Sequence, residues 1–176
     1  MERLWSPWRS EYIESISAKE NADKSGKDDG AGKTCIFCGK FSEQDDAKNL
    51  VIYRGKLSAI IMNLYPYNSG HLLIVPYAHK ATFEELTPDE NVDVMSQVGL
   101  AIKALRMISH PDGFNFGANL GKVSGAGIAD HVHFHVVPRW NGDTNFMTSV
   151  GDIRIISEEL NETFKKLTNV LAAIKP

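Results

Sequence analysis

Short apolar runs separated by turn residues dominate the middle of the chain. The runs LVIYRG (50–55), LSAIIMNL (57–64) and HLLIVP (71–76) are too short for stable helices. A turn at Gly55-Lys56 separates the first two, and the turn residues Pro66, Asn68, Ser69 and Gly70 precede the third. Runs of this length between turn residues are typical of β-strands. We therefore predict three antiparallel strands in a meander.

A helical pattern follows these strands. Apolar residues come close to the i, i+3, i+4, i+7 pattern of a helix, at Val92, Val94, Met95, Val98, Leu100, Ala101, Leu105 and Ile108. Pro88 suits the first turn of such a helix, where the N–H that it lacks would have no partner. His110-Pro111-Asp112-Gly113 is a strong stop signal. The pattern predicts one long helix from Pro88 to about His110.

Two more strands and a second helix are predicted in the last third of the chain. FNFGANL (114–120) and HVHFHVVP (131–138) have strand-like composition, and the glycine-bearing loop GKVSGAGIAD (121–130) separates them. From Ile155 to Ile174 apolar residues again follow helical spacing. We expect a C-terminal helix there.

The beginning of the chain differs from the rest. Residues 18–33 are rich in Lys, Asp, Gly and Ala and offer little to bury, which predicts a polar insertion or linker. Residues 1–17 carry Trp5 and Trp8, whose rings need cover, so we expect this N-terminal segment to pack on the domain or on a dimer partner. Residues 34–176 are predicted to form a single domain.

Composition narrows the class of protein. The 176 residues are 43% hydrophobic and 23% charged, as in a soluble globular domain, and the formal net charge is −3. This balance offers no basic stripe for nucleic acid, and no apolar run approaches the length of a membrane span. The start MERLWSPWRSEYI lacks the apolar stretch of a signal peptide. We therefore expect a cytoplasmic protein.

Most of the histidines, which can act as nucleophiles, proton donors or metal ligands, lie in two short motifs. Five of the six histidines lie in HLLIVPYAH (71–79) and HVHFH (131–135). Residues two apart in a strand share one face, so HVHFH would line up three imidazoles, with Val132 and Phe134 facing the core. The alternative is an ordinary polar sheet face. Cys35 and Cys38 are too close for a disulfide framework and indicate a metal site or a redox dithiol.

HVHFHVV resembles the signature of the histidine-triad (HIT) superfamily of nucleotide hydrolases and transferases. CIFC, NLYPYNSGHLLIVPYAH, HVVPRWNGDTNF and the opening LWSPWRSEYI are similar to the branch that includes bacterial diadenosine tetraphosphate phosphorylases and diadenosine triphosphate hydrolases. The resemblance implies an α+β fold, with a five-stranded antiparallel sheet, one long helix and a C-terminal helix. It also implies a homodimer in which the sheets of two subunits join.

The resemblance assigns a covalent mechanism to the histidines. It implies that His133, the middle member, attacks the α-phosphorus of the substrate to give a nucleotidyl-histidine. His135 would bind phosphate oxygens, and His71 would add a donor or orient the nucleophile. These roles agree with the chemistry of imidazole, which is largely neutral and nucleophilic near pH 7.

Further residues are candidates for nucleotide binding. The resemblance places Asn63 at the ribose hydroxyls and Asn119 on the phosphate side, although both residue types also suit turns and loops. The loop Ser124-Gly125-Ala126-Gly127 can bring backbone N–H groups close to phosphate. The chain departs from many relatives here, because it reads Ala126-Gly127-Ile128 where they carry Gly-Gln-Ser or Gly-Gln-Thr. The usual side-chain donor to the leaving group is missing.

A structural zinc site is the second implication of the resemblance. In relatives that bind zinc, the ligands correspond to Cys35, Cys38, His79 and His131 here. All four positions carry residues that bind zinc, which favours four sulfur or nitrogen ligands in structural sites. A redox dithiol would be expected to begin a helix after a strand in a thioredoxin-like unit, which the pattern does not indicate.

We thus expect an enzyme that cleaves dinucleoside polyphosphates through nucleotidyl-His133, with inorganic phosphate as acceptor. Lys122, Ser124, Arg139 and Trp140 are candidates for the phosphate site. Alternatives are a hydrolase that uses water, a HINT-type hydrolase of nucleoside phosphoramidates or adenylate-lysine, and a zinc-stabilised regulatory module that only binds nucleotides. The predicted partners are the nucleotide substrate and phosphate.

Overall fold

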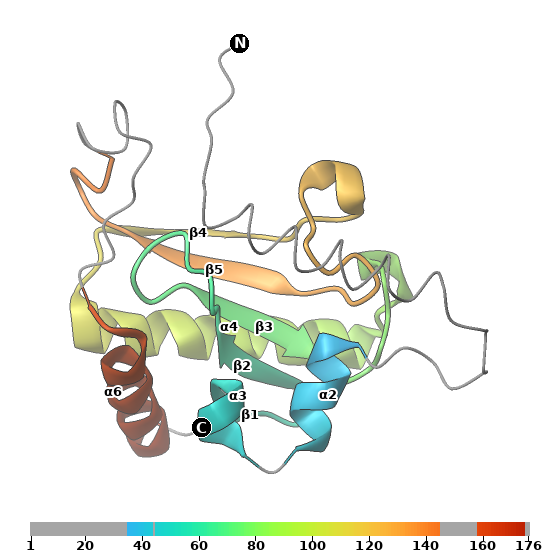
Figure 1. Cartoon of the computed structure of the whole chain (residues 1–176), viewed down its shortest axis with the longest axis horizontal. Coiled ribbons are helices and arrows are strands. Elements are labelled where there is room, and N and C mark those ends of the chain that lie inside the picture. Colours follow the sequence, from blue (N-terminus) through green and yellow to red (C-terminus); the bar gives the residue numbers. More distant parts are fainter. Residues whose placement is uncertain (1–34, 44, 145–157, 175–176) are drawn as a thin grey trace, which may run out of the picture. The chain divides into compact units, whose positions relative to one another are not determined.

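Five antiparallel strands form one sheet in the order β1-β2-β3-β5-β4 (Figure 1). The computed structural model describes residues 35–43, 45–144 and 158–174. The strands are β1 (Val51–Arg54), β2 (Ser58–Met62), β3 (Leu72–Pro76), β4 (Gly113–Gly117) and β5 (Phe134–Arg139). The first three pair as the predicted meander, and the predicted α+β class is confirmed.

The long helix α4 (Pro88–Ser109) begins and ends where the sequence predicts. Thr87 accepts a hydrogen bond from the backbone N–H of Glu90, and the Glu90 side chain returns one to the N–H of Thr87. This capping box satisfies donors that the first helical turn leaves unpaired. At the other end His110 adopts a left-handed conformation (φ 46°), which stops the helix.

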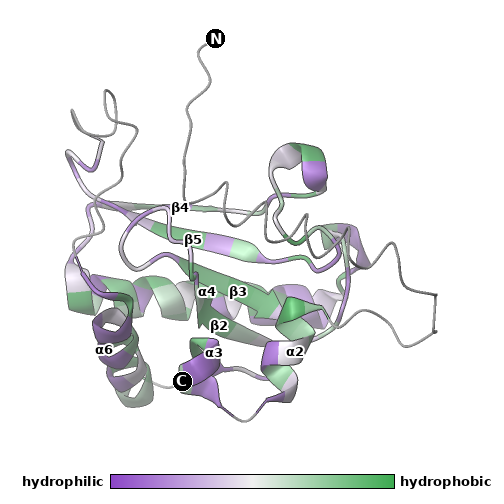
Figure 2. Cartoon of the chain, viewed as in Figure 1, coloured by the Kyte–Doolittle hydropathy of each residue, from purple (hydrophilic) through white to green (hydrophobic). Residues whose placement is uncertain are grey.

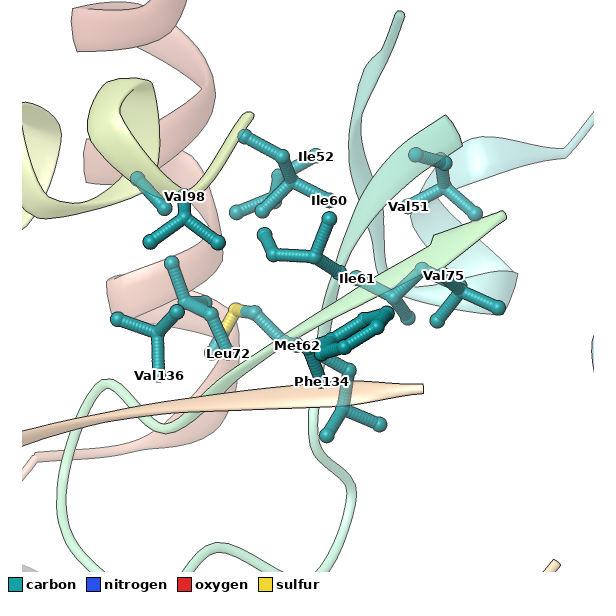
Figure 3. Close-up of a cluster of buried hydrophobic side chains, with 14 of the residues drawn as sticks. Val51, Ile52, Ile60, Ile61, Met62, Leu72, Val75, Val98, Phe134 and Val136 are labelled. Carbon is teal, nitrogen blue, oxygen red and sulfur yellow. The ribbon is translucent and has the colours of Figure 1, made fainter. Parts of the chain in front are cut away.

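The hydrophobic core lies between α4 and the central strands. Every residue of β2 and β3 is buried, and Figure 2 shows both strands in hydrophobic colours. Figure 3 shows side chains of the core in contact, among them Ile60, Leu72, Val98 and Val136. Full burial of one such side chain contributes about 1.5–3 kcal/mol, so these residues stabilise the sheet that carries the histidines.

The C-terminal helix is shorter than predicted. α6 spans Leu160–Ala173 and packs against α4 and β1, with Leu167 and Leu171 buried. Part of the predicted range, 155–157, lies outside the described residues. Residues 158 and 159 precede the helix, because Glu159 is its extended N-cap residue.

Four short elements were not predicted. They are α2 (Ile36–Ser42), α3 (Asp46–Asn49) and the two 3₁₀ turns η1 (Phe83–Glu85) and η2 (Lys122–Ser124). Each is too short to show a hydrophobic period of its own. β4 is also shorter than the predicted strand 114–120 at its end, since it ends at Gly117.

The predictions for residues 1–17 and 18–33 lie outside the described residues. No helix in the described part of the chain is long and apolar enough to cross a membrane.

Candidate active site and metal centre

The histidines meet where β3 and β5 run side by side. His71 directly precedes β3, and His135 lies in β5 opposite Leu73. His71 and His135 are therefore diagonal neighbours across the antiparallel pair, within reach of each other. Their rings are 5.1 Å apart, as are those of His133 and His135. The structure brings together the three residues predicted for catalysis.

The strand itself begins later than predicted. β5 starts at Phe134, so His131 and His133 precede it. The reason is a local detour, because the backbone N–H of Val132 donates to the carbonyl of Lys80 (2.7 Å) instead of joining the sheet. Val132 and Phe134 are nonetheless in the core, as the alternation predicts.

His133 is held in one tautomer by its own chain. Its Nδ1 lies 2.9 Å from the backbone carbonyl of His131. A carbonyl oxygen can only accept, so Nδ1 carries the proton and the lone pair of the neutral ring lies on Nε2. Burial lowers the pKa of His133 below its ordinary value, which keeps the ring neutral. His133 thus presents a basic nitrogen at neutral pH.

His71 and His135 share an ordered set of hydrogen bonds. The backbone N–H of Tyr67 donates to Nδ1 of His71 (3.1 Å), which fixes the proton of His71 on Nε2. Nε2 then donates to Nδ1 of His135 (2.9 Å). With Nδ1 accepting this bond, the neutral form of His135 carries its proton on Nε2, where it can be donated. The Tyr67 ring stacks on His135 with centroids 5.7 Å apart.

Asn63 lies beside this pair. It follows β2, and its amide Nδ2 is 3.2 Å from Nδ1 of His71, while its Oδ1 accepts from the backbone of Tyr65. Gly70, at φ +75°, turns the chain from this loop into His71. The structure thus places one of the predicted nucleotide ligands at the edge of the histidine cluster.

Two cysteines and two histidines form a second cluster. The ligand atoms of Cys35, Cys38, His79 and His131 all lie within 4.8 Å of one another. Nδ1 of His131 is 3.2 Å from Sγ of Cys35, and Nδ1 of His79 is 3.5 Å from Sγ of Cys38. Tetrahedral zinc with ordinary bond lengths would separate sulfur and nitrogen by about 3.6 Å. The four side chains therefore fit a tetrahedral metal ion.

The surrounding backbone aims His131 at this cluster. Nε2 of His131 donates to the carbonyl of Pro76 (2.9 Å), which leaves Nδ1 as the nitrogen with a lone pair toward the sulfurs. His131 is fully buried. Burial, followed by the neighbouring Cys35 sulfur, raises the pKa of Cys38, which favours the protonated thiol of Cys38 when no metal is bound. A cation at this position would reverse that preference.

The glycine-bearing loop after β4 contains η2, and the hydroxyl of its Ser124 is hydrogen-bonded within the loop. Asn119 lies between β4 and η2 and is half-buried. Gly125, with φ +91°, ends η2, and Gly127 follows two residues later. The Ser124 hydroxyl bonds the carbonyls of Leu120 and Gly121 at 2.8 and 2.7 Å. Its proton therefore goes to the backbone of its own turn and not to a ligand.

Arg139 is likewise engaged. Its guanidinium binds Asp143 through Nε and Nη2 (2.5 and 2.7 Å) and donates from Nη1 to Asn115 (2.8 Å). The indole N–H of Trp140 donates to the carbonyl of Ser109 at the end of α4. These two candidates for a phosphate site serve as structural ties. Lys122 is an exposed residue in η2.

Sequence reasoning missed several residues around the cluster. Phe37, between the two cysteines, packs its ring 5.4 Å from His131 and 5.2 Å from His133. Tyr67, Asn68 and Asp143 support His71 from the loop before β3 and the turn after β5. The signal that could have found them is that they belong to the motifs CIFC, NLYPYNSGH and RWNGD, which carry the family resemblance.

Comparisons with known proteins agree with this arrangement. The family model described as HIT domain matches residues 44–142. The AP-4-A phosphorylase of Mycobacterium tuberculosis is 39% identical over 167 residues, which are 95% of this chain and 83% of that protein. An adenosine 5′-monophosphoramidase of Schizosaccharomyces pombe is 27% identical over 75% of this chain and 99% of that protein.

A solved structure shares the fold and a related sequence. A zinc-bound histidine triad family protein from Mycobacterium smegmatis superimposes with a TM-score of 0.65 and 26% identity. The match covers 80% of this chain and 95% of that one. With the family model, the 39% identical relative and the histidine cluster in agreement, the chain belongs to the HIT family.

Proposed function

We propose that this protein cleaves dinucleoside polyphosphates such as diadenosine tetraphosphate by transferring a nucleotidyl group to His133 and then to inorganic phosphate. The observation that carries the proposal is the hydrogen bond from Nδ1 of His133 to the carbonyl of His131. It leaves a lone pair on Nε2, next to two histidines whose protons are arranged for donation. A nucleophile beside hydrogen-bond donors is the arrangement that phosphoryl-type transfer needs.

Two displacements at phosphorus complete the reaction. Nε2 of His133 attacks the α-phosphorus, a P–N bond forms, and the bond to the bridging oxygen of the leaving ATP breaks. An oxygen of inorganic phosphate then attacks the same phosphorus, the P–N bond breaks, and ADP leaves. His135, with a proton on Nε2, stabilises charge on the phosphoryl oxygens. His133 returns to its neutral tautomer, with the proton still on Nδ1.

Similarity to the AP-4-A phosphorylase supports the substrate and the acceptor. That relative matches 95% of this chain, including both halves of the histidine cluster, at 39% identity. The motif NLYPYNSGH and the first four residues of RWNGD lie within the matched region of the family, and Asp143, which Asn68 contacts, follows directly after that region. We therefore favour phosphate over water as the acceptor.

A second candidate is hydrolysis of a nucleoside phosphoramidate, with water as acceptor. The similarity to an adenosine 5′-monophosphoramidase supports it, at the lower identity of 27%. The first step would be the same, because His133 would again take the nucleotidyl group. Only the leaving group and the acceptor would differ.

We further propose that the four-residue cluster binds one structural zinc ion per chain. Cys35, Cys38, His79 and His131 supply four ligands, as closed structural zinc sites require. When bound, zinc would tie α2 to the segment that carries His133. A cytoplasmic location fits these ligands, because cysteine thiolates bind metal only while they are reduced.

A product assay tests the proposed function. The protein is incubated with diadenosine tetraphosphate, with and without inorganic phosphate, and the nucleotides are separated. We expect ADP plus ATP, at a rate that rises with phosphate concentration. AMP plus ATP at a rate independent of phosphate would assign the protein to the hydrolases. Adenosine 5′-monophosphoramidate, assayed in parallel, tests the second candidate. No cleavage of either compound would overturn both.

A further inference from the structure

Two family-type motifs that lie 75 positions apart are joined beside the histidine cluster. Nδ2 of Asn68, in the loop before β3, donates to the carboxylate of Asp143 (2.9 Å) and to the backbone carbonyl of Pro138 (3.0 Å). Both protons of the amide are therefore used across the sheet. This side chain ties the loop 63–71 to the last part of β5 and the turn that follows it.

Asp143 is itself held firmly. Arg139 binds both of its oxygens, and the backbone N–H of Trp140 donates to Oδ2 (3.2 Å). The Asp143 side chain is only 11% exposed, and the hydrogen bonds from Arg139 hold its pKa far below the usual range. Arg139 also reaches Asn115 on β4. The acceptor that receives Asn68 is thus an ionised, fixed group anchored to two strands.

The residue next to Asn68 controls a proton in the active site. The backbone N–H of Tyr67 donates to Nδ1 of His71, and this bond places the proton of His71 on Nε2, facing His135. The carbonyl of Asn68 also accepts the backbone N–H of His71 (3.1 Å). A shift of the loop would move both bonds at once.

We propose that Asn68 and Asp143 are positioning residues that fix the proton order of the His71–His135 pair. In this arrangement Asp143 accepts a hydrogen bond from Asn68, which fixes the position of the loop. The backbone N–H of Tyr67 in that loop then sets the tautomer of His71. His135 then keeps its Nε2 proton directed at the substrate phosphate. This inference rests on the proposed function for its kinetic consequence, while the arrangement of protons can be measured without any substrate.

Kinetics of three variants test the consequence for the reaction. Asn68→Ala and Asp143→Ala should each lower kcat by about 10- to 100-fold with little change in KM, because small displacements of catalytic groups cost rates of this order. The double variant should be no slower than the slower single variant, since both act through one bond. Multiplied losses in the double variant, or an unchanged kcat in Asn68→Ala, would overturn the proposal.

Asn141→Ala is the matched control. Asn141 is an exposed asparagine in the turn after β5 that also carries Asp143. Its contact to Asp112 comes from its backbone N–H, which the substitution keeps. This variant should keep the wild-type kcat. A loss equal to that of Asn68→Ala would mean that any change near the turn slows the enzyme, which contradicts a specific role for the pair.

Nuclear magnetic resonance of ¹⁵N-labelled histidine gives the readout that a general structural defect would not produce. In the wild-type protein Nδ1 of His71 should show the shift of an unprotonated nitrogen and Nε2 that of a protonated one. In Asn68→Ala, or in the milder Asn68→Ser if the alanine variant does not fold, the two shifts should move toward each other. His133 should keep its own tautomer in both proteins.

The spectra separate failure of this inference from failure of the proposed function. If diadenosine tetraphosphate is not cleaved but the His71 shifts respond to Asn68, the positioning pair stands and the substrate is wrong. If cleavage occurs but His71 carries its proton on Nδ1, or its shifts ignore Asn68, the positioning pair is wrong.

Discussion

At the scale of single residues, one hydrogen bond determines what the site can do. Nδ1 of His133 is committed to the carbonyl of His131, and that carbonyl belongs to a residue whose side chain faces the two cysteines. The same residue therefore serves the metal cluster with its ring and the nucleophile with its backbone. A metal ion bound by this cluster would therefore be coupled to the orientation of the nucleophile through His131.

Loss of the nucleophile should abolish turnover and spare binding. His133→Ala is expected to lower kcat at least a thousandfold, roughly the order seen when a catalytic nucleophile is removed. The nucleotide should still bind, because His71, His135 and Asn63 are unchanged. Steady-state kinetics and calorimetric titration with a non-hydrolysable analogue measure the two effects. A variant that retains a substantial fraction of the wild-type rate would rule out the covalent mechanism.

Asp143 should contribute to the free energy of unfolding, and this contribution should decrease in acid. Its folded pKa lies far below the unfolded value of about 3.9, so its contribution is fully present above pH 4 and disappears as the pH falls toward the folded pKa. Asp143→Asn should therefore be less stable than the wild type at pH 7, with a smaller difference at pH 3. Chemical unfolding at both values measures this, and a difference that grows in acid would contradict it.

At the scale of elements, the helices and strands with a regular hydrophobic pattern were predictable. Irregular backbone, such as the segment before β5, was not. The meander and α4 follow from apolar runs, a proline and stop residues. The late start of β5 depends on the carbonyl of Lys80, about fifty positions away, which takes the N–H of Val132. No spacing in HVHFH encodes that partner. The role of Asp143 was equally hidden, because its partner Asn68 is distant in sequence.

The candidate site divides in the same way. Motif resemblance was enough to select His71, His133, His135 and the four metal-ligand candidates, and the structure gathers each set. It was not enough for Arg139 or Ser124, whose polar groups bond neighbours that only the folded chain brings close. A residue type indicates what a side chain can bind. Which group it does bind depends on the polar groups that the folded chain places next to it.

α2 is the element that the metal cluster should hold in place. It is seven residues long, too short to be stable alone, and it brings Cys38 and Phe37 to the histidines. Cys35→Ser should lose the metal and lower Tm by roughly 2–4 °C for each kcal/mol lost. Elemental analysis and thermal unfolding of protein purified without added metal are the measurements.

Ile36→Ser, on the exposed side of the same helix, is the control and should keep its metal. If the wild type holds no metal and Cys35→Ser leaves Tm unchanged, α2 is held by packing alone.

At the scale of the whole molecule, β4 forms one edge of the described sheet and carries an exposed phenylalanine. Phe116 is 44% exposed and stacks on Phe134. An edge strand with an exposed apolar side chain is suited to pairing with a second copy. This supports the expected homodimer.

Phe116→Asp should therefore shift the protein from dimer to monomer, as measured by light scattering during size-exclusion chromatography. Asn169→Asp adds the same charge on the exposed side of α6 and should leave the mass unchanged. A wild-type protein that is monomeric at all concentrations, or a Phe116→Asp dimer, would contradict the predicted assembly.

Trapping the covalent intermediate is the decisive test of nucleotidyl transfer through His133. Enzyme and diadenosine tetraphosphate are mixed without phosphate, quenched at short times under alkaline conditions that preserve a P–N bond, and digested for mass spectrometry. The mechanism predicts one adenylyl group on the peptide that contains His133, formed as ATP is released and discharged as ADP when phosphate is added. An adenylyl group on His71 or His135, or ATP release with the protein unmodified throughout, would contradict it.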